Sequence, residues 1–394
     1  MLSCYGEFDN LAFIMRAVRM KDILLLIYNH ARNIRSCKIK AVTKTLSFIQ
    51  TNPSRLKGIN YMKPTLHFLS LTILVIICVQ ISGCSRTAEP ITETGFCLDT
   101  VVQITLYDTD GRNSCIKNIQ ECFTLIDNYE RLFSATIEGS DIWNINHSGG
   151  RPVSVCDDTV SLLQTALYYS ELSGGQVDLT VLPLSELWDF GSEENSHKPD
   201  DNAIIEAVSH IDYHMVHIDG NIVTLSDPEA SIDLGFIAKG YIADQLKEYL
   251  INQGVESACI SLGGNIITIG NKPDGQPYRI GVQKPFAADG EIITAIDVTD
   301  SSAVSSGVYE RYFYEDGVLY HHLLDTVTGY PADNNIAGVT ILTPSSVDAD
   351  ALSTTCFFLG IDKGMTLIES LDNAEVLFIT MDGELLCSDG FPLP

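Results

Sequence analysis

The amino-acid sequence predicts an α+β fold in which a mixed or antiparallel sheet is flanked by helices. Predicted strands and helices are mixed along the chain without the strict βαβ order of parallel sheets. The helical segments carry apolar residues at intervals of three and four, and the strand segments are short apolar runs bounded by turns. The chain has 394 residues, of which 45% are hydrophobic. This is enough for full cores in one large or two ordinary domains.

The expected elements follow one another along the whole chain after residue 95. The expected helices are 116–129, 160–173, 200–209, a helix after Lys239 that turns Ile242, Leu246 and Leu250 to the core, and a helix that begins at Asp348. The expected strands are 101–107, 215–218, 221–225, 258–262, 278–282, 292–298, 318–321 and 339–342, with a closing hairpin in 374–386.

The formal net charge is −27, so nucleic acids and anionic lipid surfaces are poor electrostatic partners, and we expect no nucleic acid to bind. The charge is unevenly divided. Residues 1–61 hold 10 Lys+Arg and 3 Asp+Glu, whereas residues 62–394 hold 14 and 48. The basic N-terminal extension, 1–61, is either a cytoplasmic arm or the result of an upstream choice of start codon.

Residues 62–84 resemble a bacterial lipoprotein signal. A short basic start precedes an apolar run, 68–81, of signal-peptide length, and a lipobox-like sequence follows with Cys84 as the residue to be lipidated. A single uncleaved N-terminal span is the alternative. In both cases we expect the rest of the chain to lie on the outer side of the bacterial cytoplasmic membrane, with residues 85–94 as a tether.

The chain has 11 cysteines, without a CxxC pair or a metal-like spacing. Cys259 and Cys356 lie in apolar runs and are expected to be buried thiols. The sequence leaves pairing open for Cys97, Cys115, Cys122, Cys156 and Cys387.

Residues 231–270 hold the most informative pattern. Asp233 and Lys239 flank a turn before a helix, and two glycines follow the strand 258–262. Such permissive backbone positions suit a chain that lets a ligand approach its backbone closely. An ordinary strand–helix–strand unit with turn glycines fits the same spacing equally well.

The segments 233–241 and 262–265 resemble the signature of the ApbE-like flavin transferases, the FAD:protein FMN transferases. Further segments that resemble the patterns of this family are 132–134, 175–184, 187–191, 303–311, 322–331 and 348–354. The resemblance covers about residues 95–390 and implies one flavin transferase domain with the two-lobed fold of the family. The chain departs from the family's usual residues at Leu98, Asp99, Thr136, Val177, Leu179, Thr326 and Ser353.

The resemblance implies a role for each matched side chain. The residues expected to bind FAD are Leu98, Thr136, Gln176, Val177, Asp178, Asp233, Lys239 and Leu324. His322 is expected to take a proton, because an unperturbed histidine titrates near neutrality. Lys239 is also expected to act in catalysis as a point charge on a phosphate.

Asp350 and Thr354 are spaced i,i+4, so they share one face of a helix start, and their oxygens are hard ligands that suit Mg²⁺. A helix start whose acidic residues are favoured by the helix dipole is the plain alternative. The resemblance implies a metal site here and adds the backbone carbonyl of Phe236 as a ligand. We expect Asp350 to lie at an exposed cleft.

The resemblance thus predicts Mg²⁺-dependent transfer of FMN from FAD to Thr or Ser hydroxyls, with release of AMP. The acceptors would be exported redox subunits, as in sodium-pumping quinone reductases and Rnf-type complexes. Two alternatives stay open. The same site could hydrolyse FAD to FMN and AMP, or the chain could be a lipoprotein that binds FAD without turnover.

Overall fold

The computed structural model describes residues 90–107, 111–191, 197–288 and 290–393, and these belong to one unit that begins at Thr87. The predictions for residues 1–61, for the signal or span at 62–84 and for Cys84 lie outside the described residues. Within the described part of the chain, no helix combines the length and the apolar character needed to cross a membrane.

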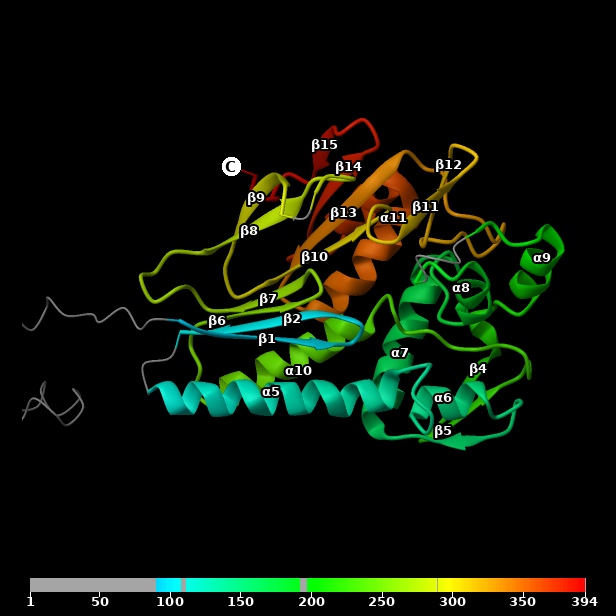
Figure 1. Cartoon of the computed structure of the whole chain (residues 1–394), viewed down its shortest axis with the longest axis horizontal. Helices are drawn as coiled ribbons and strands as arrows, with labels where there is room; N and C mark the ends of the chain where they lie inside the picture. The colour runs from blue at the N-terminus through cyan, green and yellow to red at the C-terminus, as the bar shows by residue number, and fades with distance from the viewer. Residues whose placement is uncertain (1–89, 108–110, 192–196, 289, 394) are drawn as a thin grey trace, which may run out of the picture. The chain divides into compact units, whose positions relative to one another are not determined.

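An eight-stranded sheet, antiparallel at every pairing, forms the centre of the described chain (Figure 1). In spatial order its strands are β1 (Ile91–Cys97), β2 (Thr100–Leu106), β6 (Ala258–Leu262), β7 (Asn265–Ile269), β10 (Ser302–Gly307), β13 (Ile336–Thr343), β14 (Glu375–Thr380) and β15 (Leu385–Cys387). Strand β1 pairs with β2 from Ile91 onward, so the sheet begins inside the predicted tether, 85–94, and that boundary is wrong. The antiparallel sheet with its helices confirms the predicted α+β class.

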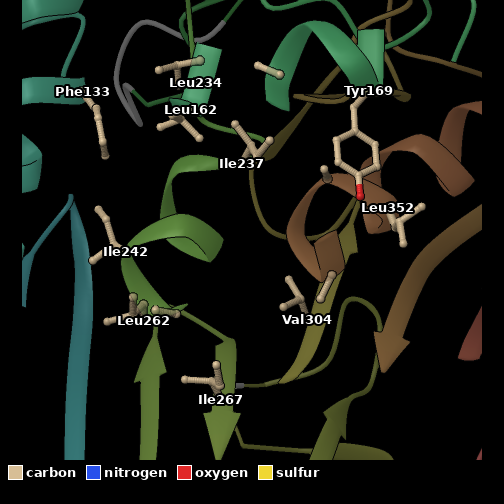
Figure 2. Close-up of a cluster of buried hydrophobic side chains, with 14 of the residues drawn as sticks. Phe133, Leu162, Tyr169, Leu234, Ile237, Ile242, Leu262, Ile267, Val304 and Leu352 are labelled. Carbon is tan, nitrogen blue, oxygen red and sulfur yellow. The ribbon is translucent and has the colours of Figure 1, made fainter. Parts of the chain in front are cut away.

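Helices pack on one face of this sheet and form the main core with it. They are α5 (Arg112–Phe133), α10 (Ala238–Asn252) and α11 (Ser346–Glu369), and α7 (Asp157–Leu172) adds to the same core by packing against α11. Figure 2 shows side chains of this core that come from α10, α11 and three strands, namely Ile242, Leu262, Ile267, Val304 and Leu352. The predicted inward-facing residues of α10 are all fully buried, which confirms the orientation of that helix.

The hairpin of β8 (Tyr278–Gln283) and β9 (Ile292–Val298) forms a separate, smaller core with side chains from the opposite face of the sheet. Strand β14 contributes to both cores. Phe378 belongs to the main core, whereas Leu377 packs with the hairpin. Successive side chains of a strand point to opposite faces. The sheet is therefore buried on both sides at β14.

A second lobe lies beside the sheet in Figure 1. We define it as α6 (Asp141–Asn146), α8 (Leu182–Trp188), α9 (Asp201–Ser209) and the small sheet of β3 (Val153–Ser154), β5 (Ile222–Leu225) and β4 (Val216–Asp219). Trp188 packs here with Leu184 and Leu324 in a small core of its own. The hairpin of β11 (Tyr312–Glu315) and β12 (Val318–His321) adds aromatic side chains to that core. This arrangement agrees with the predicted two lobes.

Most predicted elements are present with ends shifted by a few residues, and β12 has its predicted limits. The elements with no counterpart in the prediction are strands β1, β3, β7, β10 and β11 and helices α6 and α8. The sequence of β10 is rich in Ser and ends in Gly, which favours strands weakly. It is a strand because β7 and β13 pair with it on its two sides.

The described cysteines include six free thiols, which are Cys97, Cys122, Cys156, Cys259, Cys356 and Cys387. Cys356 is fully buried, as predicted. Cys259 is only half-buried, because its place in β6 turns the side chain away from the main core.

Candidate active site

Helices α10 and α11 approach each other very closely at Gly240. A Cβ atom at this position would lie 2.4 Å from the backbone oxygen of Ser346 and 2.8 Å from the Cβ of Asp350. The amide of Gly240 donates a hydrogen bond of 2.8 Å to Oδ2 of Asp350. Asp244, one turn further along α10, accepts bonds of 2.9 Å from the amides of Ser346 and Val347. The two helices therefore hold each other in one register, which places Asp350 against the first turn of α10.

The three predicted metal ligands lie at this helix junction. The amide of Gly240 is used by Asp350, and the carbonyl oxygen of Phe236, four residues earlier, accepts no hydrogen bond within the described residues. Thr354 lies one turn after Asp350, and its hydroxyl is 3.2 Å from that of Ser306. Asp350 and Thr354 therefore share one face of α11, Asp350 contacts the first turn of α10, and Phe236 lies just before that turn. The role of the three as ligands stays a prediction.

Asp350 is buried, with 5% of its surface exposed, so the expectation of an exposed position is wrong. The cause is the glycine in α10, which allows the backbone of that helix to cover the carboxylate. Burial raises the pKa of Asp350, while the ammonium of Lys239 and the amide of Gly240 oppose the rise. A buried carboxylate whose charge is only partly compensated is a group that a divalent cation can stabilise.

Five charged residues from three distant segments interact with one another, and we call them the charged cluster: Asp233, Lys239, Glu310, Arg311 and Asp350. Lys239 interacts electrostatically with all three acids, and Arg311 interacts with Asp233 and Glu310. Desolvation by neighbouring atoms raises the pKa of Glu310 to about 7, although the residue is exposed at the surface. The positive charge of Lys239 opposes the rise. Burial likewise raises the pKa of Asp233. Two cations are therefore available at this site to an anionic ligand.

His322 follows β12 and interacts with the charged cluster through Arg311. Its amide donates a hydrogen bond of 3.1 Å to the carbonyl of Arg311, and its Nδ1 atom is buried with no hydrogen-bond partner within the described residues. Burial, and then the positive charge of Arg311, lower the pKa of His322 to about 3. The expectation of a pKa near neutrality is therefore wrong for the folded protein. The ring is therefore neutral at physiological pH, and it is a weaker base than a solvent-exposed histidine.

Asp178 is buried, and the protein already uses both of its carboxylate oxygens. One oxygen accepts hydrogen bonds from the amide and the hydroxyl of Thr180, at 2.8 and 2.7 Å, and the other accepts one of 2.8 Å from the amide of Tyr213. Burial raises the pKa of Asp178 against the effect of these bonds. The carboxylate thus has a structural function, while its contact with FAD stays a prediction.

The segment that holds Gln176 and Val177 joins two parts of the site. The carbonyl of Leu179 accepts a hydrogen bond of 2.8 Å from the amide of Asp233. The carbonyl of Gly175 accepts one of 2.7 Å from the hydroxyl of Thr326. Gln176 is half-buried and Val177 is buried. The predicted FAD-binding segment is therefore adjacent to the charged cluster at one end and to the loop after His322 at the other.

No hydrogen bond or charge interaction in the described part of the chain links Leu98, Thr136 or Leu324 to the charged cluster. Leu98 lies in the turn between β1 and β2 at a φ of 54°, and its amide donates a bond of 3.1 Å to Glu130. Thr136 is exposed and bonds to Ser134. Leu324 is buried beneath Trp188.

Three polar residues of the site have no role in the sequence prediction, namely Asn265, Glu310 and Arg311. An adjacent acid and base within a matched family pattern is the sequence feature that could have identified Glu310 and Arg311. Asn265 accepts a hydrogen bond of 2.8 Å from the hydroxyl of Ser346 and so fixes the start of α11 against β7. Its position after two glycines gives no indication of this contact.

Comparison with known proteins agrees with this geometry. The model of the ApbE family matches residues 98–378. The FAD:protein FMN transferase of Treponema pallidum is 31% identical over 347 residues, which cover 84% of this chain and 96% of that protein. That of Klebsiella pneumoniae is 37% identical over 269 residues, which cover 68% and 83%.

Solved structures show the same relationship. The ApbE protein of Thermotoga maritima matches with a TM-score of 0.70 at 33% identity, covering 76% of this chain and 97% of that one. The flavin transferase ApbE of Vibrio cholerae matches with a TM-score of 0.68 at 30% identity, covering 77% and 98%.

The antiparallel sheet, the helix junction and the charged cluster, taken with these matches, define a protein of the flavin transferase class. This confirms the class of enzyme predicted from the sequence. The chain belongs to the ApbE family.

Proposed function

We propose that this chain transfers FMN from FAD to Thr or Ser hydroxyls of exported redox proteins and releases AMP, with Mg²⁺ as the cation. The observation that supports this most is the meeting of Lys239, Arg311 and Asp350, from three separate segments, at the junction of α10 and α11. The named relatives are FAD:protein FMN transferases. Both kinds of observation point to chemistry on the phosphates of a dinucleotide.

Asp350, Thr354 and the carbonyl of Phe236 would hold the cation. These donors fit Mg²⁺, because all are oxygens and because the Phe236 carbonyl has no hydrogen-bond donor among the described residues. When bound, Mg²⁺ neutralises charge that develops on the transferred phosphoryl group.

The remaining residues bind the phosphates and move the proton. Lys239 acts as a point charge and Arg311 as a planar donor toward phosphate oxygens. His322 accepts the proton of the acceptor hydroxyl at a ring nitrogen, and the support for this role is its place in the matched segment 322–331. The bond between the acceptor oxygen and the FMN phosphorus forms as the bond to AMP breaks.

The proposed place of action is the outer side of the cytoplasmic membrane, with Cys84 as a lipid anchor or with a single N-terminal span. The support for this is the sequence pattern at 62–84 alone. Mass spectrometry of the mature amino terminus separates the two anchors. We expect a lipidated Cys84 as the first residue if the segment is a lipoprotein signal, and an uncleaved segment if it spans the membrane.

The test of the activity uses the full-length chain with FAD, MgCl₂ and a purified exported redox subunit that carries an acceptor Thr. We expect flavin fluorescence on the acceptor band after denaturing electrophoresis, one AMP per label, and loss of both with EDTA. FMN and AMP without a labelled acceptor would show hydrolysis instead. Unchanged FAD would contradict both activities and leave a flavin-binding protein.

A further inference from the structure

A histidine and two glutamates converge at the end of α9, in the second lobe. Glu206 and His210 are spaced i,i+4, and Glu229 comes from the loop after β5. One ligand atom from each residue lies within 4.8 Å of the others. The Nε2 atom of His210 is 3.6 Å from a carboxylate oxygen of Glu206 and 3.5 Å from one of Glu229.

The imidazole of His210 is held in one orientation by a third acid. Its Nδ1 atom is 2.6 Å from Oδ2 of Asp227, and both side chains are largely buried, with 17% and 22% exposed. The Nε2 atom is itself buried and has no hydrogen-bond partner among the described residues. A buried ring nitrogen without a hydrogen-bond partner therefore lies between two carboxylates.

The two distances from Nε2 of His210 to the glutamate oxygens are close to the ligand–ligand distance in a metal coordination shell. A tetrahedral ion with bonds of about 2.1 Å keeps its ligand atoms about 3.4 Å apart. A carboxylate on the far nitrogen is also the usual partner of a metal-bound histidine, because it fixes the tautomer and the ring orientation. Imidazole nitrogen with carboxylate oxygen suits Zn²⁺, whereas Mg²⁺ prefers oxygen alone.

We propose that Glu206, His210 and Glu229 form a second divalent-cation site, selective for Zn²⁺ over Mg²⁺, with water as the remaining ligand and Asp227 as the residue that positions His210. The site joins α9 to the loop that leads into Ser231 and Asp233. Its role is structural, because a bound ion would fix α9 to this loop, and the site takes no part in the transfer chemistry.

A shared proton is the competing occupant, since a protonated His210 could donate from Nε2 to either glutamate. A titration distinguishes the two. The metal-stripped full-length chain is titrated with ZnCl₂ by calorimetry in excess MgCl₂, so that the proposed Mg²⁺ site is filled. We expect saturation at one Zn²⁺ per chain and a rise in melting temperature on binding.

Variants test His210, Glu229 and the positioning residue Asp227. We expect Asp227→Asn to weaken Zn²⁺ binding by about 10- to 100-fold, which is the usual effect of losing such a partner. Glu229→Gln should weaken it at least as much, and His210→Asn should abolish it. Glu369→Gln, which removes the same charge from an exposed position on α11, is the matched control and should bind Zn²⁺ like the original chain.

Absence of saturable Zn²⁺ binding would overturn the proposal, as would unchanged binding in both Glu229→Gln and His210→Asn. Glu229 is 74% exposed, so we expect Glu229→Gln to fold, and its Zn²⁺ binding can be measured even if His210→Asn does not fold. FMN transfer is measured on the same samples. Loss of Zn²⁺ binding with transfer retained, or the reverse, separates this site from the proposed function.

Discussion

A single carboxylate at Asp350 has both a structural and a proposed chemical function. Its Oδ2 atom accepts the amide of Gly240 and so joins two helices, while its charge is needed by the proposed cation. Asparagine separates the two functions. It keeps the shape and an oxygen that can accept the amide but removes the charge, whereas alanine removes both.

We therefore expect Asp350→Asn to lose Mg²⁺-dependent FMN transfer while its free energy of unfolding changes by less than about 1 kcal/mol. Asp350→Ala should lose the activity, and its free energy of unfolding should fall by about 1–3 kcal/mol, because the Gly240 amide is left buried without an acceptor. Urea unfolding and the transfer assay measure the two effects. Asp362→Asn, on an exposed part of the same helix, is the control. Equal activity in the two asparagine variants would contradict the metal assignment.

The lowered pKa of His322 gives its contribution to stability a definite dependence on pH. As pH falls below about 6.5, the unfolded chain takes up a proton on this residue, and the folded chain does so only near pH 3. The native state therefore loses stability relative to a His322→Asn variant as pH decreases in this window. The opposing contribution of Glu310, whose pKa is raised, is present in both proteins and largely cancels.

We expect the unfolding free energy of the original chain, minus that of His322→Asn, to decrease by up to about 1.4 kcal/mol per pH unit as pH falls below about 6.5. Urea unfolding at several pH values measures it. His217→Asn, which changes an exposed histidine, should show little of this dependence. A His322→Asn difference that is constant with pH would contradict the burial of a neutral ring.

The sequence indicates which residues meet at the site better than it indicates their environment. Asp350 and Thr354 could be paired because both lie on one helix, where spacing determines neighbours. The burial of Asp350 depends on Gly240, more than a hundred residues away, so no local pattern contains it. The neutral state of His322 depends in the same way on the burial and the charge that Arg311 brings.

At the scale of elements, the contact between α10 and α11 depends on the missing side chain of Gly240. A glycine inside a helix normally costs about 1 kcal/mol relative to alanine, so the exchange would be stabilising at an open position. Here a methyl group would lie 2.4 Å from a carbonyl oxygen and 2.7 Å from a Cα atom of α11. Backbone cannot give way as a flexible side chain can, so the two helices must separate.

We expect Gly240→Ala to destabilise the protein by about 1–3 kcal/mol, as other overpacked contacts do, and to abolish FMN transfer. The transfer assay and thermal unfolding measure both effects. Glu248→Ala, at an exposed position on the same helix, should change neither by much. A Gly240→Ala variant as stable and active as Glu248→Ala would mean that the helices are not in fixed contact.

Elements with a strong local pattern could be predicted, and elements that depend on their neighbours could not. Strand β12 and helix α9 have hydrophobic spacing and clear limits, and both are found close to the predicted positions. Strand β10 combines small polar residues with glycine, so its own sequence does not favour a strand. Its two neighbouring strands determine its structure, and these come from distant parts of the chain.

At the scale of the whole molecule, several hydrogen bonds link the second lobe to the rest. Trp188 donates a bond of 2.8 Å to the carbonyl of Gly329, and the side chain of Asn146 exchanges bonds of 2.9 and 2.7 Å with the backbone of Ile232. The contact at Ile232 lies directly before Asp233 of the charged cluster, and that at Gly329 lies in the loop after His322. The lobes should therefore unfold together.

The two tryptophans of the sequence, Trp143 and Trp188, both lie in the second lobe. Tryptophan fluorescence consequently reports that lobe, whereas far-ultraviolet circular dichroism reports the whole chain. We expect the two urea transitions to coincide, as in a two-state protein. A fluorescence transition at lower urea, seen also in a Trp143→Phe variant, would show that the second lobe unfolds independently.

The helix junction also has a consequence for biosynthesis. The turn that carries Asp233 and Lys239 leaves the ribosome long before α11, and α11 precedes the last two strands of the sheet. A nucleotide whose binding requires both helices can bind only when synthesis of the chain is almost complete. A chain exported through a membrane in an unfolded, extended form would reach the other side without bound FAD and would have to bind FAD there.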